Sequence, residues 1–383
     1  MIRTTTALRR CTAGALLAAV LLFGLLACTR PPHPASEKLP TPEDWQTLVG
    51  SWRSRAEAPA VVAGVDSPKR SWIGASGTAG REGGAAVDTS ASFRIGSITK
   101  VFVAVVVLQL VEEESLGLDD PVGNHLRDTP YPSVTIRQLL NHTSGIPDYS
   151  QAPALAKELF ANRDRRWQAS EVLALVSTNK PAFAPGTRYQ YSNTDYVVLG
   201  ELVGAITGRS WAEQVRQRVL DPLHLDHTFV AGWEPVPVSV VPGYFDSDND
   251  GDEENVETAG PWPALETSEG PAGAMVSTAA DLLTFGDALF RGDLLEPSSQ
   301  QAMVADGPFH PRTSNYGLGV EVLRPDYRTN LWGHGGFVPG FRSGLWYVPS
   351  RDAVLVVLTN ESRANPADLA ELLLWTLPSP APG

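Results

Sequence analysis

A serine and a lysine three residues apart, Ser97 and Lys100, are the residues of this 383-residue sequence best placed for covalent catalysis. The apolar run Val101–Val111 predicts a buried helix that Ser97 would open, with Gly117 as its C-terminal glycine. At that spacing the hydroxyl and the amine lie about 60° apart around the helix axis and share one face. A serine hydroxyl needs a base as it attacks, and a lysine whose pKa is lowered by burial could be that base. The alternative is a serine that only caps the helix.

Tyr191 and Asn193 offer a phenol and an amide within three residues, in a stretch without helical or strand periodicity. A buried lysine base needs a second group that passes the proton to the leaving group. A nearby ammonium would lower the pKa of the phenol, so Tyr191 and Lys100 could exchange one proton. The plain alternative is a loop tyrosine beside a structural asparagine.

The run His334–Gly336, read His-Gly-Gly, is expected at the end of a strand and before the turn that leads to Gly340. Two adjacent glycines allow a ligand to approach the backbone closely. The next amide, that of Phe337, could complete an oxyanion site with the amide of Ser97. Alone, the run would favour a tight turn with a hydrogen-bonded histidine.

The first 27 residues predict a signal peptide, because three arginines precede the apolar run 13–27. That run ends in Leu-Leu-Ala-Cys, which resembles the box at which bacterial lipoproteins are cleaved and acylated. Cys28 is therefore the expected lipidation site, with ordinary secretion as the alternative. Residues 28–41 are rich in proline and polar residues and predict a tether. We expect an extracytoplasmic lipoprotein held at the membrane through Cys28.

Composition excludes several classes of function. The chain has two cysteines, Cys11 and Cys28, and cleavage would remove the first, which excludes an intramolecular disulfide, cysteine catalysis and cysteine-bound zinc in the mature chain. The formal charge of −13 argues against nucleic acid as a partner. The expected substrate is a small molecule or a peptide, and the oligomeric state stays open.

The order of strand-like and helix-like segments predicts an α/β plus all-α fold. An antiparallel sheet built from both chain ends is flanked by helices, and a helical lobe is inserted between them. The serine hydrolase domain is expected over 42–377, with a sheet lobe at 42–96 and 310–377, a helical lobe at 97–309, and a disordered tail at 378–383. The expected strands are Ala58–Val65, Ser71–Gly77, Tyr316–Leu323, Asn330–Gly333, Phe341–Val348 and Ala353–Thr359.

An acidic stretch between the helices and the late strands fits the twelve-residue calcium-loop pattern. No convincing helix flanks it, so a solvated acidic insertion is the alternative. Calcium there would be structural. The proposed ligands are Asp246, Asp248, Asp250, Asp252 and Glu257.

Taken together, the three motifs and their order resemble those of the penicillin-recognising serine hydrolases, the group of class C β-lactamases, DD-carboxypeptidases and related esterases. The resemblance covers nearly all of the mature chain. Its segments are FRIGSITK (93–100), LLNHTSGIPDY (139–149), FAPGTRYQYSNTDYVVLG (183–200), AGAMVSTAADLLTFGDAL (272–289), YGLGV (316–320) and GHGGFVPGF (333–341).

The resemblance implies a β-lactamase-like fold and a role for each motif, with no cofactor needed for catalysis. Ser97 would be the nucleophile, and Lys100 with Tyr191 the proton-transfer pair. Asn193 would bind the substrate amide. His334 would take the place often held by lysine, and the substrate would also contact Gly335, Gly336 and Phe337, whose amide would share the oxyanion hole with that of Ser97. His142 would be structural.

Three departures from the family pattern bear on the substrate. Carboxypeptidases that resemble this chain have hydroxyl residues where Gly335 and Phe337 stand and an arginine where this chain has Glu321. Those groups hold the free carboxylate of the substrate peptide, so a terminal carboxylate would meet repulsion here. His334 also weakens any constant positive field, because histidine is about half neutral near its usual pKa of about 6.5.

These departures favour an esterase-like serine hydrolase that works through a Ser97 acyl-enzyme on an ester, amide or peptide bond. The first alternative is a D-alanyl-D-alanine carboxypeptidase or a β-lactamase acting on cell-wall peptides or β-lactams. The second is a penicillin-binding sensor that is acylated without turnover.

Overall fold

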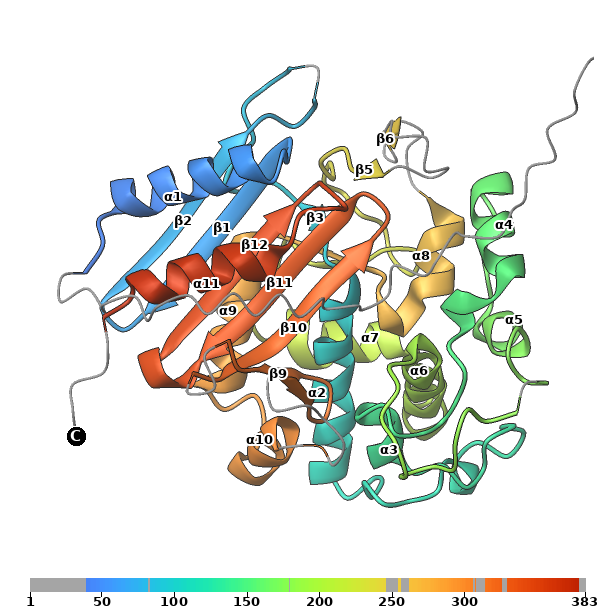
Figure 1. Ribbon diagram of the computed structural model, residues 1–383. Helices are drawn as coiled ribbons and strands as arrows, with labels where there is room; N and C mark the ends of the chain where they lie inside the picture. Colours follow the sequence, from blue (N-terminus) through green and yellow to red (C-terminus); the bar gives the residue numbers. More distant parts are fainter. Residues whose placement is uncertain are drawn as a thin grey trace, which may run out of the picture.

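The computed structural model describes residues 39–81, 83–178, 180–245, 254–255, 262–305, 307, 314–325 and 329–378. Its main sheet consists of β1 (Ala60–Ser67), β2 (Arg70–Gly77), β8 (Ser314–Tyr316), β9 (Glu321–Leu323), β10 (Leu331–Val338), β11 (Phe341–Val348) and β12 (Ala353–Thr359). The strands follow the order β2-β1-β12-β11-β10-β9-β8 with antiparallel pairing. Because β1 pairs with β12, both ends of the domain form one sheet, as the sequence predicted (Figure 1).

Helices α1 (Pro42–Arg55) and α11 (Pro366–Thr376) cover one face of this sheet (Figure 1). Thr41 caps α1 in a capping box, and proline stands in the first turn of both helices, where its missing N–H costs nothing. Trp45 and Trp52 of α1 are buried in the apolar cluster beneath. The central strand β12 is apolar without alternation because both of its faces are covered.

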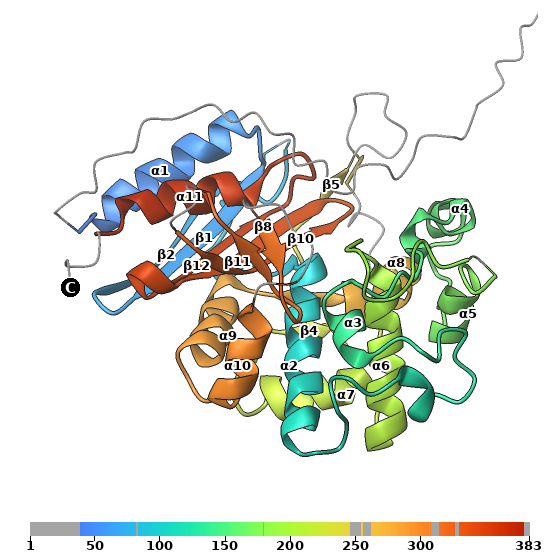
Figure 2. The same cartoon turned by 60° about the horizontal axis from the view of Figure 1, so that its bottom comes forward.

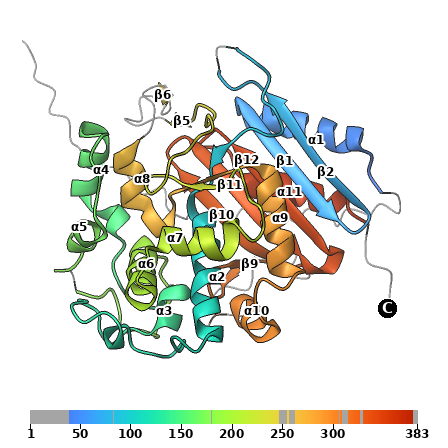
Figure 3. The ribbon, with the colours of Figure 1, turned by 180° about the vertical axis from the view of Figure 1, so that it is seen from behind.

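The opposite face of the sheet carries α9 and, beyond it, the remaining helices (Figure 3). Although α9 falls within the stretch predicted as a helical lobe, it packs on β1, β11 and β12. Figure 2 shows α2 and α6 side by side below the sheet. The helices are α2 (Thr99–Glu112), α3 (Ile136–Leu140), α4 (Pro153–Ala161), α5 (Ala169–Ala174), α6 (Asn193–Thr207), α7 (Trp211–Val215), α8 (Pro263–Glu269), α9 (Ala279–Phe290) and α10 (Pro297–Val304).

Short elements connect these helices to the sheet. Two small sheets combine β3 with β7 and β4, and β5 with β6. Their bounds are β3 (Phe93–Arg94), β4 (Phe229–Val230), β5 (Tyr244–Phe245), β6 (Glu254–Asn255) and β7 (Met275–Ser277). The 3₁₀ turns are η1 (Gly96–Ile98), η2 (Val122–Asn124), η3 (Tyr149–Gln151), η5 (Gly270–Ala272) and η6 (Pro349–Arg351), and η4 (Arg216–Leu220) is a π-helical turn.

Helix α2 is the buried helix predicted after Ser97, but both of its ends differ from the prediction. Ser97 lies in the η1 turn that precedes the α-helix. The helix ends at Glu112, and Glu114, with φ of 55°, takes the left-handed conformation expected of Gly117. The glycine lies too far along the chain to cap this helix.

Two strands also differ from the sequence prediction. The segment 316–323, expected as one strand, forms the end of β8, a turn and β9, with φ of 87° at Gly319. A Cβ at Gly319 would lie 2.3 Å from the Cβ of Ala104 in α2, so the turn needs glycine to pack there. The motif His334–Gly336, expected at a strand end, lies inside β10 because its backbone pairs with β11 through Val338.

Several predictions fall outside the described residues and stay predictions. These are the signal peptide, Cys28, most of the tether, most of the 378–383 tail, and the calcium ligands Asp246, Asp248, Asp250, Asp252 and Glu257. In the described part of the chain, no group of three or more His, Cys, Asp or Glu side chains could hold a metal ion. No helix of that part is long and apolar enough to cross a membrane.

Candidate active site

The backbone before Ser97 is pressed against strand β10. Gly96 has φ of 50°, and a Cβ there would lie 2.7 Å from the backbone nitrogen of Phe337. Only glycine fits both the conformation and this contact. The close approach brings the η1 turn that carries Ser97 beside the backbone of Phe337, as an oxyanion hole made of their two amides requires.

Gly336 makes the same close approach from the other side. A Cβ on it would lie 2.1 Å from the carbonyl oxygen of Ile95, which also accepts a hydrogen bond of 2.7 Å from the hydroxyl of Ser343. The sequence suggested that both glycines of the motif admit a ligand. Gly336 instead admits the chain's own backbone, whereas Gly335 is partly exposed.

Lys100 is fully buried, and its Nζ contacts three oxygen atoms. They are Ser97 Oγ at 3.0 Å, Asn193 Oδ1 at 2.8 Å and the carbonyl oxygen of Ala272 at 2.7 Å. The two carbonyl-type oxygens can only accept, so they take two N–H groups and leave the remaining tetrahedral position of Nζ facing Ser97. Burial lowers the pKa of Lys100 to about 7, opposed most strongly by the carboxylate of Glu269. In the neutral amine, that remaining position is the lone pair that can take the serine proton.

Tyr191 stands on the other side of the nucleophile. Its hydroxyl donates a hydrogen bond of 2.9 Å to Ser97 Oγ, and its ring centroid lies 5.0 Å from Lys100 Nζ. Burial raises the pKa of Tyr191 well above its usual value of 10. The expectation that a neighbouring ammonium lowers this pKa is therefore wrong for the resting site. The phenol is a neutral donor that can pass its proton to a leaving group.

Asn193, the first residue of α6, is fixed in orientation by three contacts on its amide. Its Oδ1 accepts from Lys100, and its Nδ2 donates to Asp148 Oδ2 at 3.2 Å and to Ser150 Oγ at 3.4 Å. Its backbone N–H also donates to Asp148 Oδ1 at 3.3 Å. The sequence analysis placed Asp148 inside a family segment but gave it no role. The signal that could have found it is a carboxylate within that family segment.

Replacing Asp148 with asparagine is expected to lower kcat/KM about 10–10²-fold, because an amide can accept with only one of its two polar atoms. Its NH₂ would face Asn193 Nδ2 and turn the Asn193 oxygen away from Lys100. The pKa of Lys100 should fall further, since the Asp148 charge raises it. The limb of the kcat/KM profile that rises with pH should therefore move to lower pH.

The matched control for this variant is Asp119→Asn, which removes an exposed carboxylate paired with Arg137. We expect no change in rate or in the pH profile from this control. An Asp148→Asn enzyme with the native rate and an unmoved limb would show that Asp148 does not orient Asn193.

His334 is buried at 2% exposure and takes no positive charge. Its Nδ1 lies against the carbonyl oxygen of Gly335, which can only accept, so Nδ1 carries the proton and Nε2 accepts from the hydroxyl of Tyr316 at 2.9 Å. Burial, with a contribution from the Lys100 charge, lowers the pKa of His334 to about 3. The sequence analysis expected His334 to weaken the positive field, and the lowered pKa agrees with this, since it leaves the imidazole neutral near pH 7.

Three acidic residues near Lys100 were not foreseen as a set: Asp195 is buried, and Glu269 and Glu321 are partly exposed. Burial raises the pKa values of Glu269 and Glu321 to about 7 and that of Asp195 well above its usual value. The charge of Lys100 lowers all three of these pKa values, so burial outweighs it. The protonation of this group of residues is therefore coupled to that of Lys100.

His142 lies beneath Tyr191, as the structural role implied by the family resemblance requires. Its Nδ1 is 3.0 Å from Asp195 Oδ2, and its ring centroid is 4.3 Å from that of Tyr191. Ser144 also donates to Asp195, at 2.5 Å. This buried cluster supports the tyrosine from below and does not reach Ser97 by any hydrogen bond among the described residues.

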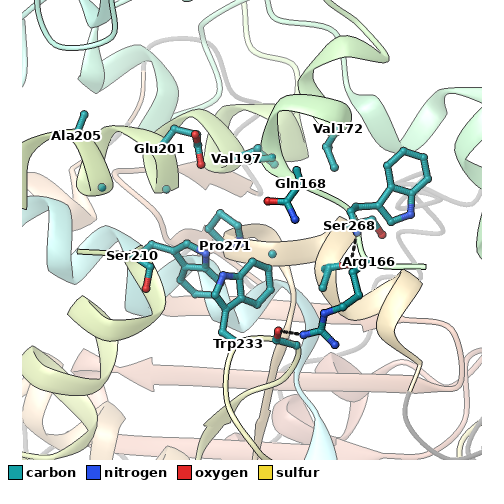
Figure 4. Close-up of a pocket in the computed structure, with 18 of the residues that line it drawn as sticks. Arg166, Gln168, Val172, Val197, Glu201, Ala205, Ser210, Trp233, Ser268 and Pro271 are labelled. Atoms are coloured by element: carbon teal, nitrogen blue, oxygen red, sulfur yellow. Dashed lines mark hydrogen bonds between the residues drawn. The ribbon is translucent and has the colours of Figure 1, made fainter. Parts of the chain in front are cut away.

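A separate cavity of about 470 Å³ lies among α5, α6, α7 and α8 (Figure 4). Trp211, Trp233 and Pro271 form part of its wall, and Pro271 precedes Ala272, whose carbonyl oxygen accepts from Lys100. Neither Ser97 nor any side chain bonded to it lines this cavity. The catalytic groups therefore lie outside it.

A model of the beta-lactamase family matches residues 47–376. The chain therefore belongs to the β-lactamase family and is a serine hydrolase of that family, and the predicted resemblance and fold are confirmed. It is 28% identical over 338 residues to penicillin-binding protein 4 of Amycolatopsis lactamdurans, covering 82% of this chain and 84% of that protein. It is 27% identical to penicillin-binding protein 4* of Bacillus subtilis over 71% of this chain, which spans 61% of that longer protein.

Two solved structures are similar over most of the chain. A D-stereospecific amidohydrolase from Streptomyces sp. has 30% identity and a TM-score of 0.77, covering 87% of this chain and 98% of that chain. The D-amino acid amidase of Ochrobactrum anthropi SV3 has 26% identity and a TM-score of 0.73, with 86% and 99% coverage. Hydrolases of amides thus share this fold and a comparable length.

Proposed function

We propose that the protein hydrolyses an ester or amide through a Ser97 acyl-enzyme, and that the far end of its substrate carries no free carboxylate. The observation that carries this proposal is the position of Glu321, whose Oε2 accepts a hydrogen bond of 3.4 Å from the N–H of Gly335. The pKa of Glu321 is raised to about 7, so above that pH its carboxylate beside β10 repels a second carboxylate. The neutral His334 supplies no compensating charge.

Acylation would use the three side chains that meet at Ser97. Ser97 Oγ attacks the substrate carbonyl carbon while its proton moves to the neutral amine of Lys100. The oxyanion would be held by the amides of Ser97 and Phe337. As the tetrahedral intermediate collapses, the Tyr191 phenol protonates the leaving group and recovers a proton from the Lys100 ammonium. Water then attacks the acyl-enzyme by the same proton path in reverse and releases the acid.

The two amidases among the similar structures support an amide or ester over a carboxyl-terminal peptide. Their names describe hydrolysis of amides, including those of D-amino acids. The curated penicillin-binding relatives favour the alternative, a D-alanyl-D-alanine carboxypeptidase or β-lactamase. The position of Glu321 supports an ester or amide over both alternatives, because each of them acts on substrates that carry a carboxylate.

The ratio of kcat/KM for p-nitrophenyl butyrate to that for a diacetyl-Lys-D-Ala-D-Ala peptide measures this choice. We expect a ratio well above one, and slow hydrolysis of a chromogenic cephalosporin. The physical reason is the repulsion between Glu321 and the peptide carboxylate. A ratio below one would restore the carboxypeptidase alternative and would imply that a cation such as Arg342 reaches the carboxylate.

Turnover separates the enzyme from a sensor that is acylated once. We expect steady product release over hundreds of turnovers, since Lys100 and Tyr191 remain in place to activate the deacylating water. A single burst equal to the enzyme concentration would instead support the sensor.

Two further sequence predictions remain proposals beside this function. We propose that the protein is exported and anchored to the membrane through a lipid on Cys28, which globomycin-sensitive processing would test.

We also propose that the loop from Asp246 to Glu257 binds a structural calcium ion. Calcium should then raise the melting temperature relative to the melting temperature in a chelator.

A further inference from the structure

The geometry points to a positive charge on the substrate: we propose that Glu321 binds an ammonium group at the end of the substrate that lies over Gly335. This inference rests on the proposed function. It names which of the substrates without a free carboxylate the site selects. It differs from a general preference for neutral esters. A carboxylate that only excluded anions would not distinguish a cationic substrate from its neutral isostere.

Glu321 is placed at the open part of the site by its position in the sheet. It lies at the start of β9 opposite Gly333, and its side chain extends along β10 to the N–H of Gly335. Gly335 has no side chain to cover the carboxylate, and a Cβ there would still leave 3.9 Å to Oε2. Glu321 is partly exposed, so an incoming group can reach it.

The charge of Glu321 is not balanced by a basic side chain within 4.0 Å in the described part of the chain. Arg342, the basic residue nearest in the β10–β11 pairing, is used elsewhere. Its Nε donates to the carbonyl oxygen of Ser362 at 2.8 Å, and its guanidinium lies 4.6 Å from the ring centroid of Phe337. Glu321 therefore has one amide donor and free lone pairs on its carboxylate.

Aromatic rings near Glu321 favour an ammonium group over a neutral group. Tyr316 pairs with Glu321 across β8 and β9, so the two side chains lie on the same face of the sheet. The Tyr316 centroid is 6.0 Å from that of Tyr189 and 6.3 Å from that of Tyr191. Aromatic faces combined with a carboxylate are the surroundings that bind quaternary ammonium groups.

The test compares two thioesters of equal shape. Butyrylthiocholine carries a trimethylammonium group, and S-(3,3-dimethylbutyl) thiobutyrate replaces its nitrogen with carbon and is neutral. We expect kcat/KM to be about tenfold higher for the cationic thioester, because a carboxylate and aromatic rings together attract the trimethylammonium group. In Glu321→Gln, which can still accept from Gly335, the ratio of the two kcat/KM values should fall to about one, whatever change in rate the two thioesters share through Lys100.

Glu269→Gln is the control, since it removes another acidic group near Lys100 from a different element of the fold. It should alter the rates of both thioesters but leave their ratio at the native value. A native ratio of one, or a ratio that Glu321→Gln leaves unchanged, would overturn the inference. A ratio lost equally in Glu269→Gln would also overturn it, by showing a general field in place of a local contact.

Calorimetric titration with choline gives a readout that needs no turnover. The native protein should bind choline, and Glu321→Gln should bind it at least tenfold more weakly. Choline binding that depends on Glu321, without hydrolysis of either thioester, would contradict the proposed function and leave the ammonium site standing. Hydrolysis of both thioesters at equal rates, without choline binding, would support the proposed function and contradict the ammonium site.

Discussion

Lys100→Met is expected to lower kcat/KM for p-nitrophenyl butyrate by about 10⁴-fold, the upper end of what a positioned general base contributes. The amine is the one base within hydrogen-bond distance of Ser97 Oγ in the described structure, and methionine removes its lone pair at nearly equal volume. The oxygens of Asn193 and Ala272 lose a donor. A melting temperature close to the native value would show that the variant is folded.

Lys100→Arg is the matching control for charge. Arginine keeps a cation at this position but does not deprotonate in proteins, so it should be as inactive as methionine. The native enzyme should show kcat/KM rising with pH through about 7, as the Lys100 ammonium loses its proton. This limb should be absent in both variants. Retention of more than about a tenth of the native activity in either would remove Lys100 as the base.

Tyr191→Phe is expected to lower kcat/KM by about 10²–10³-fold for an alkyl ester or an amide, whose leaving group needs a proton. The loss should be much smaller for a p-nitrophenyl ester, because nitrophenolate leaves without protonation. The phenol is suited to this step since its raised pKa keeps it protonated at rest.

Tyr189→Phe tests whether the effect belongs to the hydroxyl at Ser97. Tyr189 is a neighbouring tyrosine whose hydroxyl has no hydrogen bond to Ser97 in the described structure, and its removal should change both rates by less than about threefold. Equal losses for the alkyl and nitrophenyl esters in Tyr191→Phe would show that the phenol acts on the nucleophile and not on the leaving group.

Local sequence patterns were sufficient to predict much of the fold. The strands Phe341–Val348 and Ala353–Thr359 have the predicted bounds, because a clear turn separates them and β12 is a continuous apolar run. The position of Gly319 could not be predicted. Its turn depends on the distance to α2, which is a tertiary contact that no neighbouring residue encodes.

The spacing of Ser97 and Lys100 predicted a contact that the structure contains, and the order of motifs indicated Tyr191 and Asn193 as their partners. The titration of these groups could not be predicted, since it depends on how deeply each is buried. Burial keeps the Tyr191 phenol and the His334 imidazole neutral. The contact of Asp148 with Asn193 joins residues far apart in sequence and needed the fold to be seen.

The covalent adduct itself tests the central claim most directly. After incubation with a fluorophosphonate, intact-mass analysis should show one adduct per chain, and peptide mapping should place it on Ser97. The Ser97→Ala variant should remain unlabelled. Labelling that persists in this variant, or that maps to Ser177 in the other serine-lysine pair of this spacing, would contradict the assignment of Ser97 as the nucleophile.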